Sequence, residues 1–145
     1  MRPWRVVLDT MVWFSAAANP GGAPGEIVRL ARGGAFRIVT STAIRDEILD
    51  VLTRPQNREL FDSRFDAEEW LDVVEFGAAD VIQDSLGPRI SADPKDDMFC
   101  WAAFTGAATH IVSKDPDLRN LKHYRGAQVL APAAFLAAWR VHTGR

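Results

Sequence analysis

The chain has 145 residues, of which 48% are hydrophobic, and a formal net charge of −2. This size suits one domain with its own core, so we expect residues 1–145 to form a single domain that needs no disulfide or structural metal. The near balance of acidic and basic residues argues against a passive nucleic-acid coat protein, which is usually clearly basic. The single cysteine, Cys100, lies in an apolar run and is expected to be a buried thiol.

The N-terminal apolar stretch superficially resembles a signal peptide, because Arg2 and Arg5 precede it and Ala16-Ala17-Ala18 end it. Asp9 lies in its middle, however, where a charge weakens a hydrophobic segment. We therefore expect a buried strand followed by a short helix. No apolar run approaches the roughly 18–20 residues that span a bilayer, and the sequence predicts a cytoplasmic protein without membrane contact.

Apolar periodicity predicts the remaining elements. In chain order we expect a strand at 5–8, a helix at 25–32, a strand at 36–40, helices at 42–52, about 67–78 and about 94–105, strands at 109–113 and 128–130, and a helix at about 133–141. Ile44, Ile48 and Leu52 form one apolar stripe of the second helix. Asp66 is the expected cap of the third. The polar segment 54–65 contains Pro55 and is ambiguous between a helical turn and a loop.

Strands that alternate with helices predict an α/β fold, with a mainly parallel sheet of four to five strands between two helical layers. Right-handed crossovers place the C-terminal ends of the parallel strands along one edge of the sheet. Open α/β sheets bind their ligands at that edge. The functional residues are therefore expected there.

Four carboxylates are predicted to meet at this edge. Asp9 directly follows the first strand, and Asp115 follows the strand at 109–113. Glu47 lies in the first two turns of the helix at 42–52, beside its apolar stripe, and Asp97 lies in the first turn of the helix at about 94–105. Anions that are brought together repel each other and need compensation.

Divalent cations supply that compensation. Mg²⁺ or Mn²⁺ suits carboxylate and water ligands, whereas zinc prefers histidine or cysteine. Such ions lower the pKa of a bound water molecule and stabilise the oxygens of an in-line phosphodiester displacement. The expected reaction is hydrolysis of a nucleic-acid backbone, with no side-chain nucleophile.

Simpler structural roles compete with metal binding. Asp115 precedes Pro116, which is typical of a helix start whose carboxylate caps free backbone N–H groups. Asp96 is suited to interact favourably with a helix dipole, and Glu47 with solvent on a polar helix face. Asp9 is the hardest to explain in this way, because a carboxylate directly after a buried strand is costly unless it is paired.

The sequence resembles PIN domains, particularly the prokaryotic subgroup of toxins from toxin–antitoxin pairs. The matching segments are RVVLDT at 5–10, GGAPGEIVRLA at 21–31, FRIVTSTAIRDEILDVLTRP at 36–55, DPKDDMFCWAAFTGAATHIVSKDPDL at 93–118 and VLAPAAFL at 129–136. These segments cover nearly the whole chain in the family's order. The resemblance implies a PIN-like three-layer fold and endoribonuclease activity with Mg²⁺ or Mn²⁺. It also implies an RNA substrate, a cognate antitoxin protein as partner, and a homodimer.

The family's four acids map onto the same positions, with Asp97 preferred to Asp96 because of its distance to the following strand. The catalytic and metal-binding set is therefore Asp9, Glu47, Asp97 and Asp115. The supporting residues are Thr10, Ser41, Asp96, Ser113 and Asp117. Ser41 and Ser113 match hydroxyl positions suited to a metal-held water or a phosphate, and Asp117 matches a frequently acidic position.

Met11 departs from the family pattern, which has Asp-Thr-Asn after the first strand. Methionine cannot orient a carboxylate or a substrate by hydrogen bonding as asparagine does. We therefore expect reduced activity, and a PIN-like module that binds RNA or an antitoxin without cleavage is the alternative. A phosphatase of the haloacid-dehalogenase type is a further alternative, but it leaves Glu47 without a role and lacks the typical second aspartate at position 11.

Overall fold

The computed structural model describes residues 3–61, 66–70, 79–82, 87–90 and 94–144, and the structural statements below concern these residues. Residues 67–70 are also helical. The elements with defined bounds are β1 (Arg5–Leu8), α1 (Thr10–Ala18), α2 (Ala23–Arg32), β2 (Arg37–Ser41), α3 (Thr42–Leu52), the 3-10 helix η1 (Pro55–Leu60), β3 (Ala79–Ile82), the 3-10 helix η2 (Pro94–Asp96), α5 (Asp97–Thr105), β4 (His110–Val112), α6 (Pro116–Arg119), β5 (His123–Tyr124), β6 (Ala127–Leu130) and α7 (Pro132–Thr143).

The strands form one sheet in the order β3-β2-β1-β4-β6-β5. All neighbouring pairs are parallel except β5 and β6, which are antiparallel. Val6 of β1 is in register with Ile38 on one side and His110 on the other. The predicted α/β class with a mainly parallel sheet is therefore confirmed. The C-terminal ends of β1, β2 and β4 share one edge, as expected.

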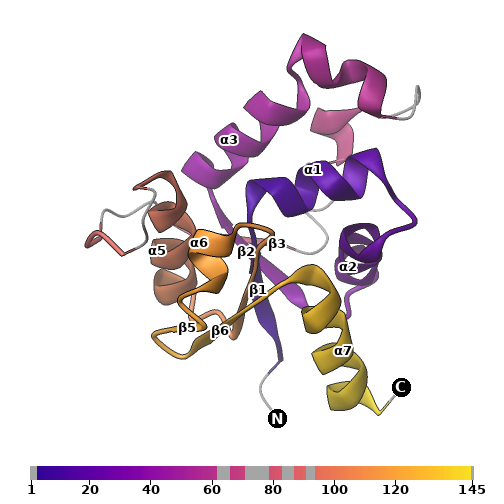
Figure 1. The fold of residues 1–145 in the computed structure, drawn as a ribbon. Helices are drawn as coiled ribbons and strands as arrows, with labels where there is room; N and C mark the ends of the chain where they lie inside the picture. Colours follow the sequence, from indigo (N-terminus) through magenta and orange to yellow (C-terminus); the bar gives the residue numbers. More distant parts are fainter. Residues whose placement is uncertain (1–2, 62–65, 71–78, 83–86, 91–93, 145) are drawn as a thin grey trace.

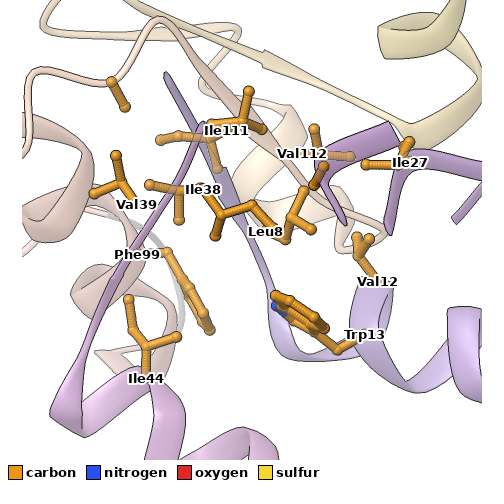
Figure 2. Packing of buried hydrophobic residues seen from close by; sticks show 14 of the residues in the cluster. Leu8, Val12, Trp13, Ile27, Ile38, Val39, Ile44, Phe99, Ile111 and Val112 are labelled. Atoms are coloured by element: carbon orange, nitrogen blue, oxygen red, sulfur yellow. The ribbon is translucent and has the colours of Figure 1, made fainter. Parts of the chain in front are cut away.

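Helices cover both faces of this sheet. Figure 1 shows α5 on one side of β1 and β2, and α2 together with α7 on the other. In the core, Phe99 of α5 and Ile44 of α3 approach Leu8 from one side, while Ile27 of α2 lies beside Val112 (Figure 2). Close packing on both faces explains why β1, β2 and β4 are buried along nearly their whole length rather than at alternate positions.

The predicted elements agree with the structure where it describes them, apart from small shifts at the ends, two strands and the short helix α6, which was not predicted. β3 and β5 were not expected; β3 is a short run interrupted by Asp80, and β5 has only two residues. Asp66 does cap the helix at 67–70, because its carboxylate accepts a hydrogen bond from the N–H of Glu69 at 3.1 Å. The rest of that predicted helix, 71–78, lies outside the described residues. The ambiguous segment contains η1, and residues 62–65 also lie outside the description.

An aromatic cluster closes the opposite edge of the sheet, where α7 packs near the chain's N-terminal end. The ring of Trp4 lies 4.0 Å from that of His110, 5.1 Å from Trp139 and 4.7 Å from His142, measured between centroids. Burial, with a further effect of His142, lowers the pKa of His110 to about 4. His110 is therefore a neutral core residue, and the aromatic side chains here serve packing.

Among the described residues, none of the helices has both the length and the apolar character that crossing a membrane requires.

Candidate metal centre

Asp9 occupies the turn from β1 into α1, at the centre of the sheet edge. Its side chain is 4% exposed and caps α1, because Oδ1 accepts a hydrogen bond from the N–H of Val12 at 3.0 Å. Oδ2 accepts hydrogen bonds from the hydroxyl group of Ser113 and from the N–H of Lys114, the latter at 3.2 Å. The polypeptide thus holds a buried carboxylate in a fixed orientation at the end of a strand.

Burial raises the pKa of Asp9 above its ordinary value. The hydrogen bonds from Ser113, Val12 and Lys114 act in the opposite direction but do not offset the desolvation, and the charge of Asp115 raises the pKa further. A buried carboxylate whose ionised form is disfavoured by its surroundings is a common feature of functional sites. A nearby cation is the usual means of stabilising the ionised form.

Three carboxylates next to this turn come close enough to share one ion. The ligand atoms of Asp96, Asp115 and Asp117 lie within 4.8 Å of one another, and this is the one such group within the described ranges. Asp115 follows β4 and caps α6, since its Oδ1 accepts a hydrogen bond from the N–H of Asp117 at 2.9 Å. Asp115 therefore caps α6 and also lies close to two other acids.

Glu47 reaches the same edge from α3. The hydroxyl group of Thr10, the first residue of α1, donates a hydrogen bond to Oε2 of Glu47. Because Thr10 directly follows Asp9, this contact brings the Glu47 carboxylate beside the turn that contains Asp9. Thr10 therefore links α1 and α3 through this hydrogen bond.

Asp97 is not one of the three acids whose ligand atoms lie within 4.8 Å of one another. It is the first residue of α5 and is fully buried, and its Oδ2 accepts a hydrogen bond from the N–H of Ile90 at 3.2 Å. Nε of Arg89 lies 3.5 Å from the same oxygen. The group of acids that lie close enough to share an ion contains Asp96, the neighbour of Asp97, whereas the sequence analysis preferred Asp97.

Ser41 and Ser113, the two expected hydroxyl residues, have different roles. Ser113 is fully buried and joins Asp9 to Asp115, because its oxygen also accepts a hydrogen bond from the N–H of Asp115 at 2.9 Å. Ser41 caps α3 by accepting a hydrogen bond from the N–H of Ile44 at 3.3 Å. Ser113 is thus part of the acidic site, whereas the hydroxyl group of Ser41 is used in helix capping.

Cys100 of α5 is fully buried. Burial, together with the charges of Asp97 and Asp96, raises the pKa of its thiol to about 12. A thiol that stays protonated is a poor ligand and a poor nucleophile. The donor set at this edge is therefore made of carboxylate oxygens, which suits a hard cation such as Mg²⁺ or Mn²⁺.

The sequence analysis did not predict the contacts that Arg89, Ile90 and Lys114 make with the acids. Arg89 and Ile90 precede Asp97 by several residues, in a segment without apolar periodicity. Ile90 and Lys114 act through backbone N–H groups, which every residue except proline carries. Lys114 lies between two predicted site residues, Ser113 and Asp115. That position could have indicated that its backbone is close to the site.

Comparisons with known proteins agree with this architecture. A family model described as "PIN domain" matches residues 5–117. The structure resembles PAE2754 from Pyrobaculum aerophilum with a TM-score of 0.57 and 13% sequence identity, over 95% of this chain and 90% of that chain. It also resembles VapBC2 from Rickettsia felis, solved bound to a DNA fragment from its promoter, with a TM-score of 0.53 and 14% identity, over 86% of this chain and 96% of that chain. At these identities the structural matches establish the fold alone. No curated protein sequence matches the chain significantly.

Proposed function

The chain belongs to the PIN domain family, and on this basis we propose that it is a metal-dependent endoribonuclease that hydrolyses RNA phosphodiester bonds. The observation that carries the proposal is the group of carboxylates at the C-terminal edge of the sheet. Asp96, Asp115 and Asp117 have ligand atoms within 4.8 Å of one another, and the buried Asp9 lies next to them. Such a group of anions is unfavourable without a cation, and its oxygen donors suit Mg²⁺ or Mn²⁺.

We assign the direct metal contacts to Asp115 and to one or both of Asp96 and Asp97, with Asp9 and Glu47 completing the acidic set. When bound, the ion supplies a water molecule of lowered pKa and stabilises charge on the phosphate. The protein's own part is to fix the acids. Ser113 and two backbone N–H groups orient Asp9, and Thr10 orients Glu47. Such hydrogen-bonding partners hold metal ligands in one orientation.

The direct test is cleavage of a mixed RNA pool with Mn²⁺ by wild type, with EDTA as one control and Asp97→Asn and Asp115→Asn as variants. Asp46→Asn is the matched control, because Asp46 is an exposed residue of α3. We expect cleavage by wild type and Asp46→Asn, and loss of cleavage with EDTA and in both site variants. Cleavage that persists in the site variants would show a contaminating nuclease or a different site.

Metal binding is tested separately from activity by thermal unfolding. A ligand that binds only the folded state stabilises it by about 2.7 kcal/mol at a concentration of about 100 times its Kd. We expect Mn²⁺ to raise the Tm of wild type and of Asp46→Asn, and to have little effect on Asp115→Asn. An equal rise in all three proteins would place the ion elsewhere.

We further propose that the protein is the cytoplasmic toxin of a toxin–antitoxin pair, as its resemblance to that subgroup implies. The structural similarity to VapBC2, which was solved with promoter DNA, supports a partner protein that binds DNA. Co-expression with the product of a neighbouring small gene, followed by co-purification, tests this. Size-exclusion chromatography of each protein alone and of the mixture reports both the complex and the expected homodimer.

A non-catalytic binding module is the second candidate, and Met11 is the observation that favours it. Met11 lies in the first turn of α1, two residues after Asp9, and is 46% exposed. Binding of metal and RNA by folded wild type without cleavage would select this function. A phosphatase that forms a phosphoaspartate is less well supported, because both oxygens of the buried Asp9 carboxylate already accept hydrogen bonds.

A further inference from the structure

Trp101 holds the segment 87–90 against α5. Its indole Nε1 donates a hydrogen bond to the carbonyl oxygen of Pro88 at 2.9 Å. Gly87 lies so close to the ring that an added Cβ would be 2.4 Å from Cδ1 of the indole, a distance that real Cβ atoms do not reach. Figure 1 shows this segment beside α5. Tryptophan and glycine together therefore fix where the segment passes.

This placement delivers Arg89 to the border of the acidic site. Trp101 is four residues after Asp97 in α5, so the two side chains lie on one face of that helix. Both contact the segment 87–90. The N–H of Ile90 donates to Oδ2 of Asp97 at 3.2 Å, and Nε of Arg89 lies 3.5 Å from that oxygen. One end of the Arg89 side chain is thereby anchored.

The rest of the Arg89 side chain is open to solvent. It is 67% exposed, whereas the side chain of Asp97 is fully buried. Ion pairs with an exposed partner contribute little stability, about 0–1 kcal/mol. The contact through Nε also leaves the two terminal nitrogens of the guanidinium group, which carry four of its five N–H donors. These are the donors that bind phosphate in a bidentate manner.

A cation at this border favours the approach of RNA to the acidic site. A phosphodiester is itself an anion and is repelled by carboxylates, so a basic side chain there adds to the attraction of any metal ion that the acids hold. We propose that Arg89 is a substrate-positioning residue that binds a backbone phosphate of single-stranded RNA next to the acids, with the segment 87–90 and Trp101 setting its position. This inference rests on the proposed nuclease function for its substrate class.

The competing role for Arg89 is that of a counterion for Asp97 alone. The two roles differ in RNA binding measured without cleavage. A phosphate contact contributes about 0.7 to the slope of log K against log salt concentration for a single strand, whereas a counterion contributes nothing. The probe is a fluorescein-labelled single-stranded RNA oligonucleotide, followed by fluorescence anisotropy over a salt series. Parallel series use EDTA and Ca²⁺, so that binding is read with and without a cation at the acids.

The variants are Arg89→Gln, Arg89→Lys and the matched control Arg32→Gln. Arg32 is an exposed arginine at the end of α2, just ahead of β2, and so near the opposite edge of the sheet. We expect Arg89→Gln to weaken RNA binding on the order of tenfold at low salt and to lower the slope by about 0.7. Arg89→Lys should keep the salt dependence of wild type but only part of its affinity for RNA. Lysine retains the positive charge but cannot bind a phosphate through two parallel N–H groups as arginine does. Arg32→Gln should match wild type.

Trp101→Phe provides a second variant that leaves Arg89 in place. It keeps an aromatic ring under Gly87 but removes the hydrogen bond to Pro88, so we expect an intermediate loss of affinity. RNA binding by Arg89→Gln with the affinity and slope of wild type would overturn the proposal, as would wild type that binds no RNA in either series. If RNA binds, and binds through Arg89, but is never cleaved, the nuclease proposal fails while this inference stands.

Discussion

Ser113 donates a hydrogen bond from its hydroxyl group to Oδ2 of Asp9, across the ends of the neighbouring strands β4 and β1. The same hydroxyl oxygen accepts a hydrogen bond from the N–H of Asp115 at 2.9 Å. One small buried side chain therefore sets the orientation of one acid and the backbone position of another. Neither acid is held by the sheet alone, and the geometry of the site depends on this serine.

Ser113→Ala should lower the affinity for Mn²⁺ by about tenfold or more, the effect usually seen when a hydrogen-bonding partner of a metal site is removed. Loss of the hydroxyl group leaves Oδ2 of Asp9 with only the N–H of Lys114, and it removes a hydrogen bond that lowers the pKa of Asp9. Isothermal titration calorimetry with Mn²⁺ provides the measurement. Ser15→Ala is the matched control, because the Ser15 hydroxyl contacts the side chain of Lys114 rather than an acid. Equal affinities in both variants would count against this role.

Asp9→Asn should change how the stability of the metal-free protein depends on pH. Burial raises the pKa of Asp9, so the folded protein holds its proton more tightly than the unfolded chain, in which an aspartate has a pKa of about 3.9. Ionisation above that pH therefore costs the folded state stability, and asparagine avoids this cost. The difference in free energy of unfolding should shift in favour of Asp9→Asn as the pH rises from about 4 to 7.

Urea unfolding of both proteins in EDTA across this pH range measures the shift. Asp46→Asn, at an exposed position of α3, serves as the control and should show no comparable trend. Saturating Mn²⁺ should reverse the order at pH 7, because the cation stabilises the ionised carboxylate of wild type. The prediction would be wrong if, in EDTA, the free energy of unfolding of wild type rose relative to that of Asp9→Asn as the pH increases.

Met11→Asn should increase the rate of RNA cleavage. Met11 lies in the first turn of α1 and is 46% exposed, so an asparagine there does not disturb the core. One additional hydrogen bond to substrate in the transition state is worth about 1 kcal/mol, or roughly fivefold in rate. Initial rates under single-turnover conditions with Mn²⁺ test this. Leu60→Asn, at another exposed apolar residue, controls for solubility. An unchanged rate would mean that methionine does not limit activity.

His110→Phe should make the protein more resistant to mild acid. Burial lowers the pKa of His110 to about 4, while an unfolded histidine has a pKa near 6.5. As the pH falls from about 6.5 to 4, the unfolded chain takes up a proton that the folded protein excludes. The free energy of unfolding of wild type should therefore fall by on the order of 2 kcal/mol relative to that of the variant.

Denaturant unfolding of wild type and His110→Phe at pH 7, 6, 5 and 4 measures that difference. Carboxylates that titrate in this range affect both proteins alike and cancel. Phenylalanine keeps an aromatic ring against Trp4 and Phe135. His123→Phe, at an exposed position of β5, is the control. A constant difference across the pH range would show that His110 titrates as in the unfolded chain.

The sequence predicted the central strands and the sheet edge because those features depend on local patterns. A buried strand shows as a short apolar run, and a carboxylate directly after it can be assigned to the strand end without knowledge of the rest of the fold. Asp9, at the end of β1, illustrates this. β3 escaped prediction because its place depends on distant partners: Asp80 is paired with both Arg5 and Arg37.

The choice between Asp96 and Asp97 was beyond the sequence for a geometric reason. Consecutive residues of a helix point about 100° apart, so a shift of one residue in the start of α5 exchanges which acid faces the site. That start depends on the 3-10 turn at 94–96 and on the segment 87–90, which binds Asp97. Neither the 3-10 turn nor the position of the segment 87–90 shows as a pattern along the sequence. The catalytic set therefore stays a prediction that the variants above must decide.

The position of β1 in the middle of the sheet fixes when the acidic site can form during synthesis. β1 pairs with β2 early in the chain, but its other neighbour is β4, and the hydrogen bond from Ser113 to Asp9 spans 104 residues. At about 5–20 residues per second, the ribosome needs roughly 5–20 seconds between making the two ends of that contact. Throughout that time a nascent chain carries Asp9 without Ser113 and Lys114, two of its three hydrogen-bond partners. The acidic site can therefore be complete only after the ribosome has passed Asp117, the last of the clustered acids.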